Sequence, residues 1–191
     1  MLTYIYSTVN AGKSANLLMR THSCKERKIS HCVFVPAIAQ VRDGEANVQS
    51  RVGFNQKAIP LNEKDNPLKV VVENIVAGDP YQVVFVDEAQ FLTKDQVRNL
   101  TQICDELEIP VFAYGLRTDF KGEPFEGSKY LMAWADNIEE IATFEAGTAS
   151  KATFNQKINE KGDPTKSGRP ISPGFGYLPV SRKTFNLSEK A

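Results

Sequence analysis

Ser7-Thr-Val-Asn-Ala-Gly-Lys-Ser14 is the stretch of this sequence that decides its fold. It follows the phosphate-binding loop pattern G-x-x-x-x-G-K-[ST], except that Ser7 takes the place of the first glycine. Such a loop holds phosphate with backbone N–H groups, a helix N-terminus and a lysine, while its last hydroxyl binds magnesium. The stretch therefore predicts a nucleoside triphosphate site with Mg²⁺. The predicted phosphate-binding residues are Ser7, Thr8, Val9, Asn10, Ala11, Gly12, Lys13 and Ser14.

The loop lies between a predicted strand and a predicted helix. Residues 2–6 are a short apolar and aromatic run, and residues 14–27 carry apolar positions and a basic end. A Gly-Lys-Ser turn that arose by chance would rarely have this context, so we interpret the stretch as a functional loop.

Further apolar runs alternate with helix-like stretches along the chain. The runs span residues 32–36, 83–87 and 109–115. Continuous apolar runs are typical of strands that a parallel sheet buries on both faces. The helix-like stretches span residues 68–77 and 93–107, and the second begins with a capping box. This alternation predicts an α/β fold of the P-loop NTPase class, RecA-like, with a mainly parallel sheet.

Two segments break this alternation. Residues 39–67 are polar with weak periodicity, which indicates a flexible excursion or a hairpin over the sheet edge. Glycine and proline crowd residues 162–176, too densely for a regular element. We expect a P-loop α/β nucleotide-binding domain over residues 1–143 and a small β-type subdomain with a long loop over residues 144–191.

An acidic pair, Asp87-Glu88, ends the apolar run that begins at Val83. A carboxylate at the carboxyl end of a strand can hold magnesium beside loop-bound phosphates. We therefore assign Asp87, together with Ser14, to Mg²⁺ and Glu88 to general base catalysis toward an acceptor hydroxyl or water. A solvated charge at the strand end remains the alternative for Glu88.

The composition argues against several classes of protein. Lysine plus arginine and aspartate plus glutamate number 23 each, so the formal net charge is +0 and no overall field attracts nucleic acid or a membrane. The chain begins without a basic leader, and no run approaches the roughly 18 apolar residues that span a bilayer. We expect a cytoplasmic protein without a nucleic acid or membrane partner. The three cysteines fit no disulfide framework, so we expect them reduced and mostly buried.

Several motifs together resemble the cytosolic, type II thymidine kinases. They are the loop at 7–14, Ser-Arg-Val-Gly at 50–53, Asp-Glu-Ala-Gln-Phe-Leu at 87–92, Tyr-Gly-Leu-Arg-Thr-Asp-Phe at 114–120, Pro-Phe at 124–125, Gly-Ser at 127–128 and, more weakly, residues 177–183. The resemblance implies an enzyme that transfers the γ-phosphoryl group of ATP to the 5′-hydroxyl of thymidine. Deoxyuridine is a further candidate substrate, and dTMP for DNA precursor synthesis is the implied product.

The resemblance also implies roles for single residues. Glu88 matches the group that accepts the proton of the 5′-hydroxyl, and Gln90 lies with Asp87 in the stretch that touches triphosphate and metal. Phe120 matches a ring that packs against thymine, although a plain core phenylalanine is the alternative. Residues 166–177 resemble a lasso that binds thymine largely through its backbone. The implied thymidine-binding residues are Glu88, Leu116, Phe120, Ile171, Ser172 and Tyr177.

The chain departs from the family pattern in two places. The family carries Asp-x-Arg after its second strand, whereas this chain reads Ala39-Gln-Val-Arg42, which keeps only the phosphate-site arginine, Arg42. The family's four zinc ligands are replaced by Glu145-Ala-Gly147 and Ser181-Arg-Lys-Thr184, so we predict a subdomain without zinc. The hydrophobic contacts predicted to hold that subdomain instead are those of Phe144, Phe154 and Phe185.

The hypotheses for function are therefore a thymidine kinase, a P-loop ATPase in which Glu88 activates water without a nucleoside acceptor, and a nucleotide-binding homologue with weakened catalysis. For the kinase, the resemblance implies a homotetramer that thymidine triphosphate inhibits.

Overall fold

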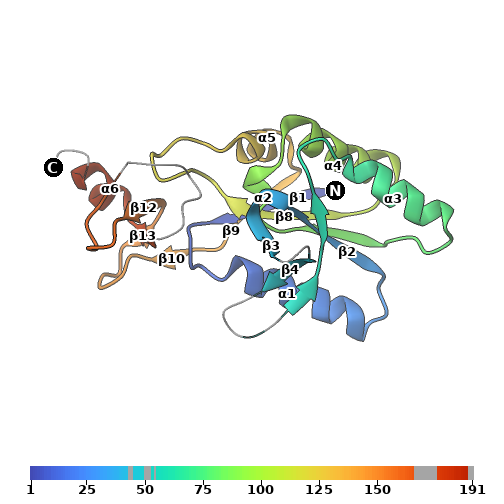
Figure 1. Ribbon diagram of the computed structural model, residues 1–191, viewed down its shortest axis with the longest axis horizontal. Coiled ribbons are helices and arrows are strands. Elements are labelled where there is room, and N and C mark those ends of the chain that lie inside the picture. The colour runs from blue at the N-terminus through green and yellow to red at the C-terminus, as the bar shows by residue number, and fades with distance from the viewer. Residues whose placement is uncertain (43–44, 50–52, 54, 166–175, 189–191) are drawn as a thin grey trace.

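A computed structural model of the chain describes residues 1–42, 45–49, 53, 55–165 and 176–188 (Figure 1). Its centre is a six-stranded, wholly parallel sheet in the order β6-β2-β7-β8-β1-β9. The strands are β1 (Leu2–Ser7), β2 (His31–Pro36), β6 (Ile59–Leu61), β7 (Val83–Val86), β8 (Val111–Leu116) and β9 (Asn137–Glu140). The helices of this part are α1 (Lys13–Glu26), α2 (Ala37–Gln40), α3 (Pro67–Val76), the 3₁₀ helix η1 (Ala89–Phe91), α4 (Lys94–Glu106) and α5 (Glu126–Trp134).

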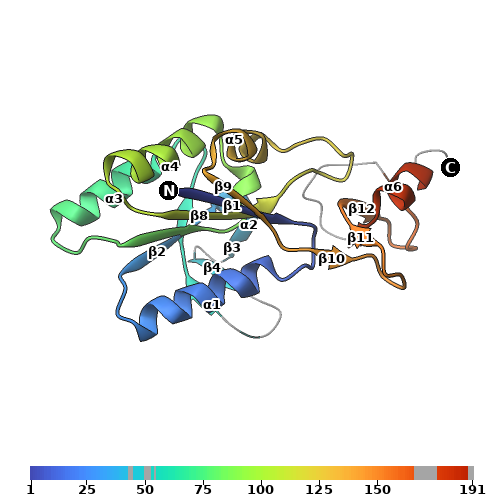
Figure 2. The same ribbon diagram turned by 180° about the vertical axis from the view of Figure 1, so that it is seen from behind.

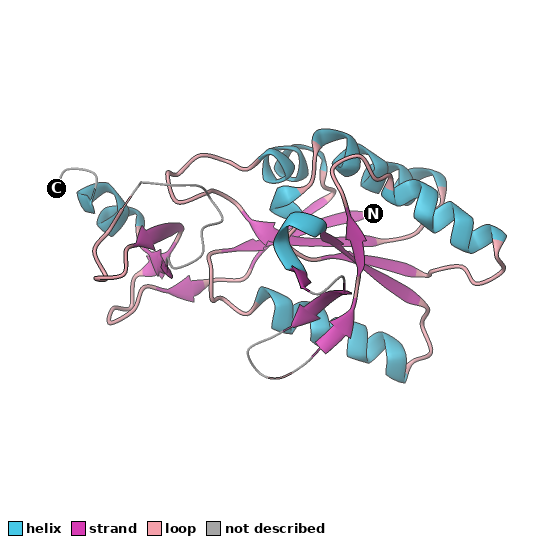
Figure 3. Cartoon of the chain, viewed as in Figure 1, coloured by secondary structure: helices cyan, strands magenta, loops and turns pink. Residues whose placement is uncertain are grey.

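Helices cover both faces of the sheet. Helix α1 lies on one face, and α3, α4 and α5 lie on the other, as Figures 2 and 3 also show. Successive residues of β1 point to opposite faces, so Tyr4 packs in the cluster beneath α4 while Ile5 packs in the cluster beneath α1. Because both faces are buried, the strands inside the sheet need mostly apolar residues, which explains the continuous apolar runs of β2, β7 and β8.

The segment over residues 39–67 contains the hairpin that the sequence predicted. Strands β3 (Val41–Arg42), β4 (Glu45–Gln49) and β5 (Asn55–Lys57) form a small antiparallel sheet. Ala46 and Val48 of β4 are buried in the cluster beneath α1. The end of the segment was not expected, because Ile59–Leu61 joins the main sheet as an edge strand beside β2. Its three residues include a proline and are too few to show a strand period.

The sheet brings the phosphate loop and the acidic pair to one edge. Strands β1 and β7 are parallel and both end there, with β8 between them. The predicted RecA-like P-loop fold is therefore confirmed. Two local predictions also hold: Thr93 and Gln96 form the capping box that begins α4, and all three cysteines are free.

A small subdomain lies beyond the carboxyl ends of the strands (Figure 1). Its elements are β10 (Thr143–Phe144), β11 (Lys151–Ala152), β12 (Phe154–Ile158), β13 (Gly176–Val180) and α6 (Arg182–Ser188). The rings of Phe154 and Phe185 stack with centroids 4.4 Å apart, as expected of a hydrophobic contact that holds this part. The expectation for Phe144 is wrong, because its side chain is 67% exposed on a two-residue strand. Across the described residues, no helix combines the length and apolar character needed to cross a membrane.

Candidate active site

The phosphate loop connects β1 directly to the N-terminus of α1. Gly12 has φ +86°, a left-handed conformation that favours glycine, and it immediately precedes the first helical residue, Lys13. A Cβ atom at Gly12 would meet nothing within 4 Å, so the backbone conformation rather than crowding calls for glycine here. The unpaired N–H groups of the first turn of α1 thus point toward the loop, as an anion site requires.

Lys13 is buried and folds back along the loop. Its Nζ atom donates hydrogen bonds to Ser7 Oγ at 3.1 Å and to the Thr8 carbonyl oxygen at 2.8 Å. Burial lowers the pKa of Lys13, while the charges of Glu88 and Asp87 act in the opposite direction. Ser7, the residue that departs from the loop pattern, therefore supplies an acceptor for the lysine that glycine lacks.

Ser14 and Asp87 meet as the sequence predicted. Ser14 Oγ donates to Asp87 Oδ2 at 3.1 Å, and Asp87 is completely buried. Burial, followed by the neighbouring Glu88 charge, raises the pKa of Asp87 to about 7. A hydroxyl and a carboxylate are hard oxygen donors of the kind that Mg²⁺ prefers, and a cation would offset the buried negative charge. The two residues therefore fit a magnesium ion.

Glu88 is held in place by Gln90. Glu88 adopts a left-handed conformation with φ +50°, which is uncommon outside glycine and concentrates at functional sites. Gln90 Nε2 donates to Glu88 Oε2 at 2.5 Å, and Gln90 Oε1 accepts from the Leu116 amide at 3.0 Å. Strand β8 thus orients the amide that orients the carboxylate. The predicted contact of Gln90 with the triphosphate stays a prediction, whereas its role in orienting Glu88 was not foreseen.

The predicted thymine-binding rings lie near each other. Phe120 is buried, and its ring centroid lies 6.4 Å from that of Tyr177. Lys157 of β12 is completely buried, with Nζ 4.9 Å from the Phe120 ring centroid. Sequence reasoning missed Lys157, because only the tertiary fold places β12 over this ring.

Other predicted residues have different outcomes. Leu116 lies at the end of β8, where its carbonyl oxygen accepts from Tyr4 Oη at 2.9 Å and from Ser128 Oγ at 2.5 Å. Ile171 and Ser172 lie outside the described residues. Arg42 is the last residue of β3. Its side chain lies outside the described part of the chain, so its phosphate contact stays a prediction.

Three of the positions that the resemblance assigns to zinc ligands, Glu145, Ser181 and Thr184, lie together in the subdomain. Ser181 Oγ donates to Thr184 Oγ1 at 3.2 Å, and the Thr184 amide donates to Ser181 Oγ at 3.3 Å. Hydrogen bonds from Thr184 and Ser181 lower the pKa of the half-buried Glu145 carboxyl. We call Glu145, Ser181 and Thr184 the polar clasp. Within the ranges that the structure describes, no three His, Cys, Asp or Glu side chains cluster to hold a metal ion.

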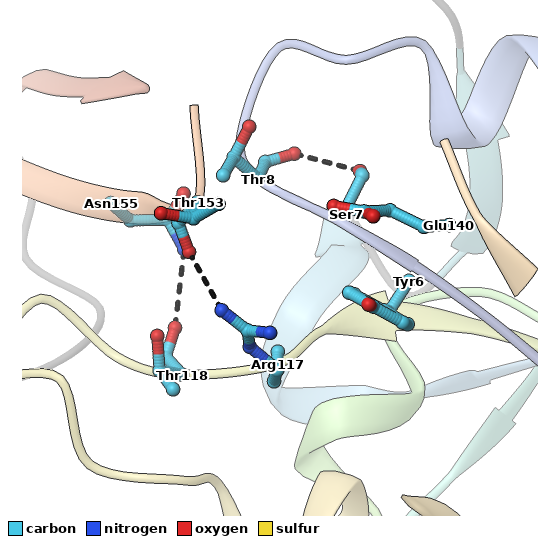
Figure 4. A pocket seen from close by; sticks show the side chains of 8 residues that line it. All are labelled: Tyr6, Ser7, Thr8, Arg117, Thr118, Glu140, Thr153 and Asn155. Atoms are coloured by element: carbon cyan, nitrogen blue, oxygen red, sulfur yellow. Dashed lines mark hydrogen bonds between the residues drawn. The ribbon is translucent and has the colours of Figure 1, made fainter. Parts of the chain in front are cut away.

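A small pocket marks the junction between the phosphate loop, the end of β8 and the subdomain (Figure 4). Its lining residues are Tyr6, Ser7, Thr8, Arg117, Thr118, Glu140, Thr153 and Asn155. Arg117 Nη2 donates across the junction to the Thr153 carbonyl oxygen at 3.2 Å. Asn155 makes two further bonds across it, to the Val9 amide and the Thr118 carbonyl oxygen. Strand β12 therefore contacts both the phosphate loop and the segment that leads to Phe120.

Comparison with known proteins places these features in a family. The thymidine kinase family model matches residues 1–172. A thymidine kinase of Coxiella burnetii is 43% identical over 190 residues, which cover 98% of this chain and 96% of that protein. A thymidine kinase of Pasteurella multocida is 44% identical over 183 residues, covering 95% and 94%. Among solved structures, flagellar accessory protein FlaH of Methanocaldococcus jannaschii has a TM-score of 0.47 and 14% identity, over 79% of this chain and 75% of that one. The chain has the phosphate loop and the acidic pair, and it matches the thymidine kinases over nearly its full length. It belongs to the thymidine kinase family.

Proposed function

We propose that this protein is a thymidine kinase that transfers the γ-phosphoryl group of ATP to the 5′-hydroxyl of thymidine, giving dTMP for DNA precursor synthesis. The observation that carries the proposal is the meeting of Ser14 with Asp87 beside the phosphate loop, with Glu88 next in the chain, in a member of this family. These groups are the ones that phosphoryl transfer needs: phosphate donors, a metal site and a base.

The donor half of the site binds the triphosphate of ATP. Loop amides and the N-terminus of α1 hold phosphate oxygens, and Lys13 exchanges its contacts with Ser7 and Thr8 for them. Ser14 and Asp87 hold Mg²⁺, which neutralises charge on the phosphate oxygens when it is bound.

The acceptor half positions thymidine and removes its proton. Phe120 stacks on the base, with Tyr177 beside it and the lasso residues Ile171 and Ser172 binding through their backbone. Glu88, oriented by Gln90, accepts the 5′-hydroxyl proton as that oxygen attacks the γ-phosphorus and ADP leaves. The hydrogen bond from the Leu116 amide of β8 fixes Gln90, which in turn holds the Glu88 carboxylate toward the thymidine half of the site.

A nucleoside panel tests this function. Purified protein with Mg·ATP should release ADP with thymidine, and with deoxyuridine more weakly, but not with deoxycytidine or deoxyguanosine. The Glu88→Gln variant should lose about 10²–10⁴-fold in kcat, because it removes the base but keeps the shape of the side chain. Equal ADP release without any nucleoside would instead identify an ATPase. No ADP release under either condition would identify a homologue with weakened catalysis.

We extend the proposal to the properties that the resemblance implies. The enzyme acts in the cytoplasm as a homotetramer, thymidine triphosphate inhibits it, and its subdomain over residues 144–191 folds without zinc. Light scattering tests the oligomeric state of the purified protein, inhibition kinetics test the effect of thymidine triphosphate, and metal analysis tests the absence of zinc.

A further inference from the structure

We infer that Asn155 is a positioning residue that couples the ATP-binding loop to the thymidine-binding segment. The inference rests on the proposed kinase function for its ligands, but its geometry stands independently. Asn155 belongs to the subdomain, whereas both of its hydrogen-bond partners belong to the P-loop domain.

The side chain of Asn155 bridges two backbone groups that are far apart in the sequence. The Val9 amide donates to Asn155 Oδ1 at 2.8 Å, and Asn155 Nδ2 donates to the Thr118 carbonyl oxygen at 3.1 Å. Figure 4 shows Asn155 beside Thr118 at the junction. Val9 lies in the phosphate loop, and Thr118 lies two residues before Phe120. One side chain therefore spans the donor and acceptor halves of the site.

Burial makes these bonds specific. Asn155 is 3% exposed, so water does not readily replace a lost bond. The short carboxamide of asparagine carries a hydrogen-bond acceptor, the carbonyl oxygen, and a donor, the NH₂ group, on the same planar group. Aspartate cannot donate to Thr118, and an apolar residue of similar size can pair with neither group.

The same strand reaches the thymine-binding ring. Residues 155 and 157 lie two apart on β12, so their side chains share one face of the strand. Lys157 contacts the Phe120 ring from that face while Asn155 contacts the phosphate loop. In the antiparallel pairing of β12 with β13, Lys157 lies opposite Tyr177. When bound thymidine holds β12 in place, the Val9 amide is therefore held with it.

A second contact at this junction, that of Arg117, serves as a comparison. Arg117, which follows β8, donates to the carbonyl oxygen of Thr153, the residue before β12, and its Cζ atom lies 5.5 Å from the Tyr6 ring centroid. The stacked pair Phe154 and Phe185 stabilises the subdomain beside Gly122 and takes no part in the hydrogen bonds of Asn155. Loosening that pair disturbs the subdomain but leaves the Asn155 bridge chemically intact.

The test compares binding of a non-hydrolysable ATP analogue with Mg²⁺, alone and with saturating thymidine, in wild type, Asn155→Leu, Asn155→Asp and the control Phe185→Leu. In wild type, thymidine should tighten analogue binding about fivefold or more, within the usual range of coupling between sites. Both Asn155 variants should reduce this factor to about one, and Asn155→Leu should also weaken analogue binding without thymidine. The control should keep the wild-type coupling even if its melting temperature falls.

Steady-state kinetics supply a second measurement. Asn155→Leu should lower kcat about tenfold, because the donor and acceptor halves are no longer held in register. Wild-type coupling and kcat in both Asn155 variants would overturn the inference, and so would an equal loss of coupling in Phe185→Leu. Failure of wild type to phosphorylate thymidine would overturn the proposed function instead, since analogue binding without thymidine still tests the Val9 contact.

Discussion

Asp87 and Glu88 are adjacent in the chain but lie in different surroundings. Asp87 continues β7 into the interior and pairs with Ser14, so its carboxylate is enclosed at the proposed metal position. Glu88 turns outward through its left-handed backbone and is held by Gln90. The turn between the two residues thus separates the proposed metal ligand from the proposed base.

The buried carboxyl of Asp87 predicts a pH-dependent stability of the protein without ligand or metal. Its pKa of about 7 in the folded state exceeds the ordinary value of 3.8, so its contribution to stability is complete below about pH 4 and is lost as pH rises through 7. From pH 4 to pH 8, Asp87→Asn should gain about 4 kcal/mol relative to wild type, or about 8–16 °C in melting temperature. Thermal melts in chelated buffer measure the difference. A constant difference across this pH range would contradict the expectation.

At the scale of elements, the site depends on how closely α5 packs on η1. A Cβ atom at Gly127, in the first turn of α5, would lie 2.9 Å from the Leu92 carbonyl oxygen and 3.0 Å from that of Gln90. At Gly115 on β8 it would lie 3.0 Å from Gln90 Oε1. Two glycines therefore let a helix and a strand enclose the short element that carries Gln90.

Gly127→Ala should consequently both destabilise the protein and slow catalysis. The added methyl group pushes α5 away from η1, which costs about 1–3 kcal/mol as overpacking usually does. It should also lower kcat, since Gln90 orients Glu88. Denaturant unfolding and steady-state kinetics measure the two effects, with Lys129→Ala on the exposed side of α5 as the control. An unchanged stability would show that α5 moves freely over η1.

At the scale of the whole molecule, hydrogen bonds of Arg117 and Asn155 join the segment with β10–β13 and α6 to the part with the main sheet. The polar clasp lies within that segment. The clasp connects the β10–β11 hairpin to the start of α6 through Glu145, Ser181 and Thr184. Its carboxylate and hydroxyls occupy the positions where the family resemblance implies zinc.

The clasp predicts a small dependence of the subdomain's stability on pH and no dependence on zinc. Because the pKa of Glu145 is lowered in the folded state, its stabilising contribution is present above the ordinary value of 4.5 and is lost as pH falls further. Glu145→Gln should lower the melting temperature slightly at pH 7, with a smaller difference near pH 3.5. A zinc chelator should leave the wild-type melting temperature unchanged. A clear drop on chelation would show that a metal holds the fold.

Sequence alone determined the parts of this protein whose signals are local. The phosphate loop needs a left-handed glycine, a lysine and a hydroxyl at fixed spacing, so residues 7–14 predict it from the sequence. Strands buried on both faces must be continuously apolar, which revealed the runs at 32–36, 83–87 and 109–115. The polar edge strand β9, the short strand β6 and helix α6 carry no such signal, because neighbouring elements specify them.

Only the tertiary structure decided how the site is held together. Gln90 orients Glu88 because its amide is fixed by β8, 26 residues further along the chain. Asn155 reaches Val9 across 146 residues, and Lys157 reaches Phe120 through the placement of β12. Contacts between residues so far apart leave no spacing pattern in a single sequence, since folding rather than local periodicity brings them together. Local sequence patterns thus identify the chemical groups of the site, whereas the folded chain determines their orientation.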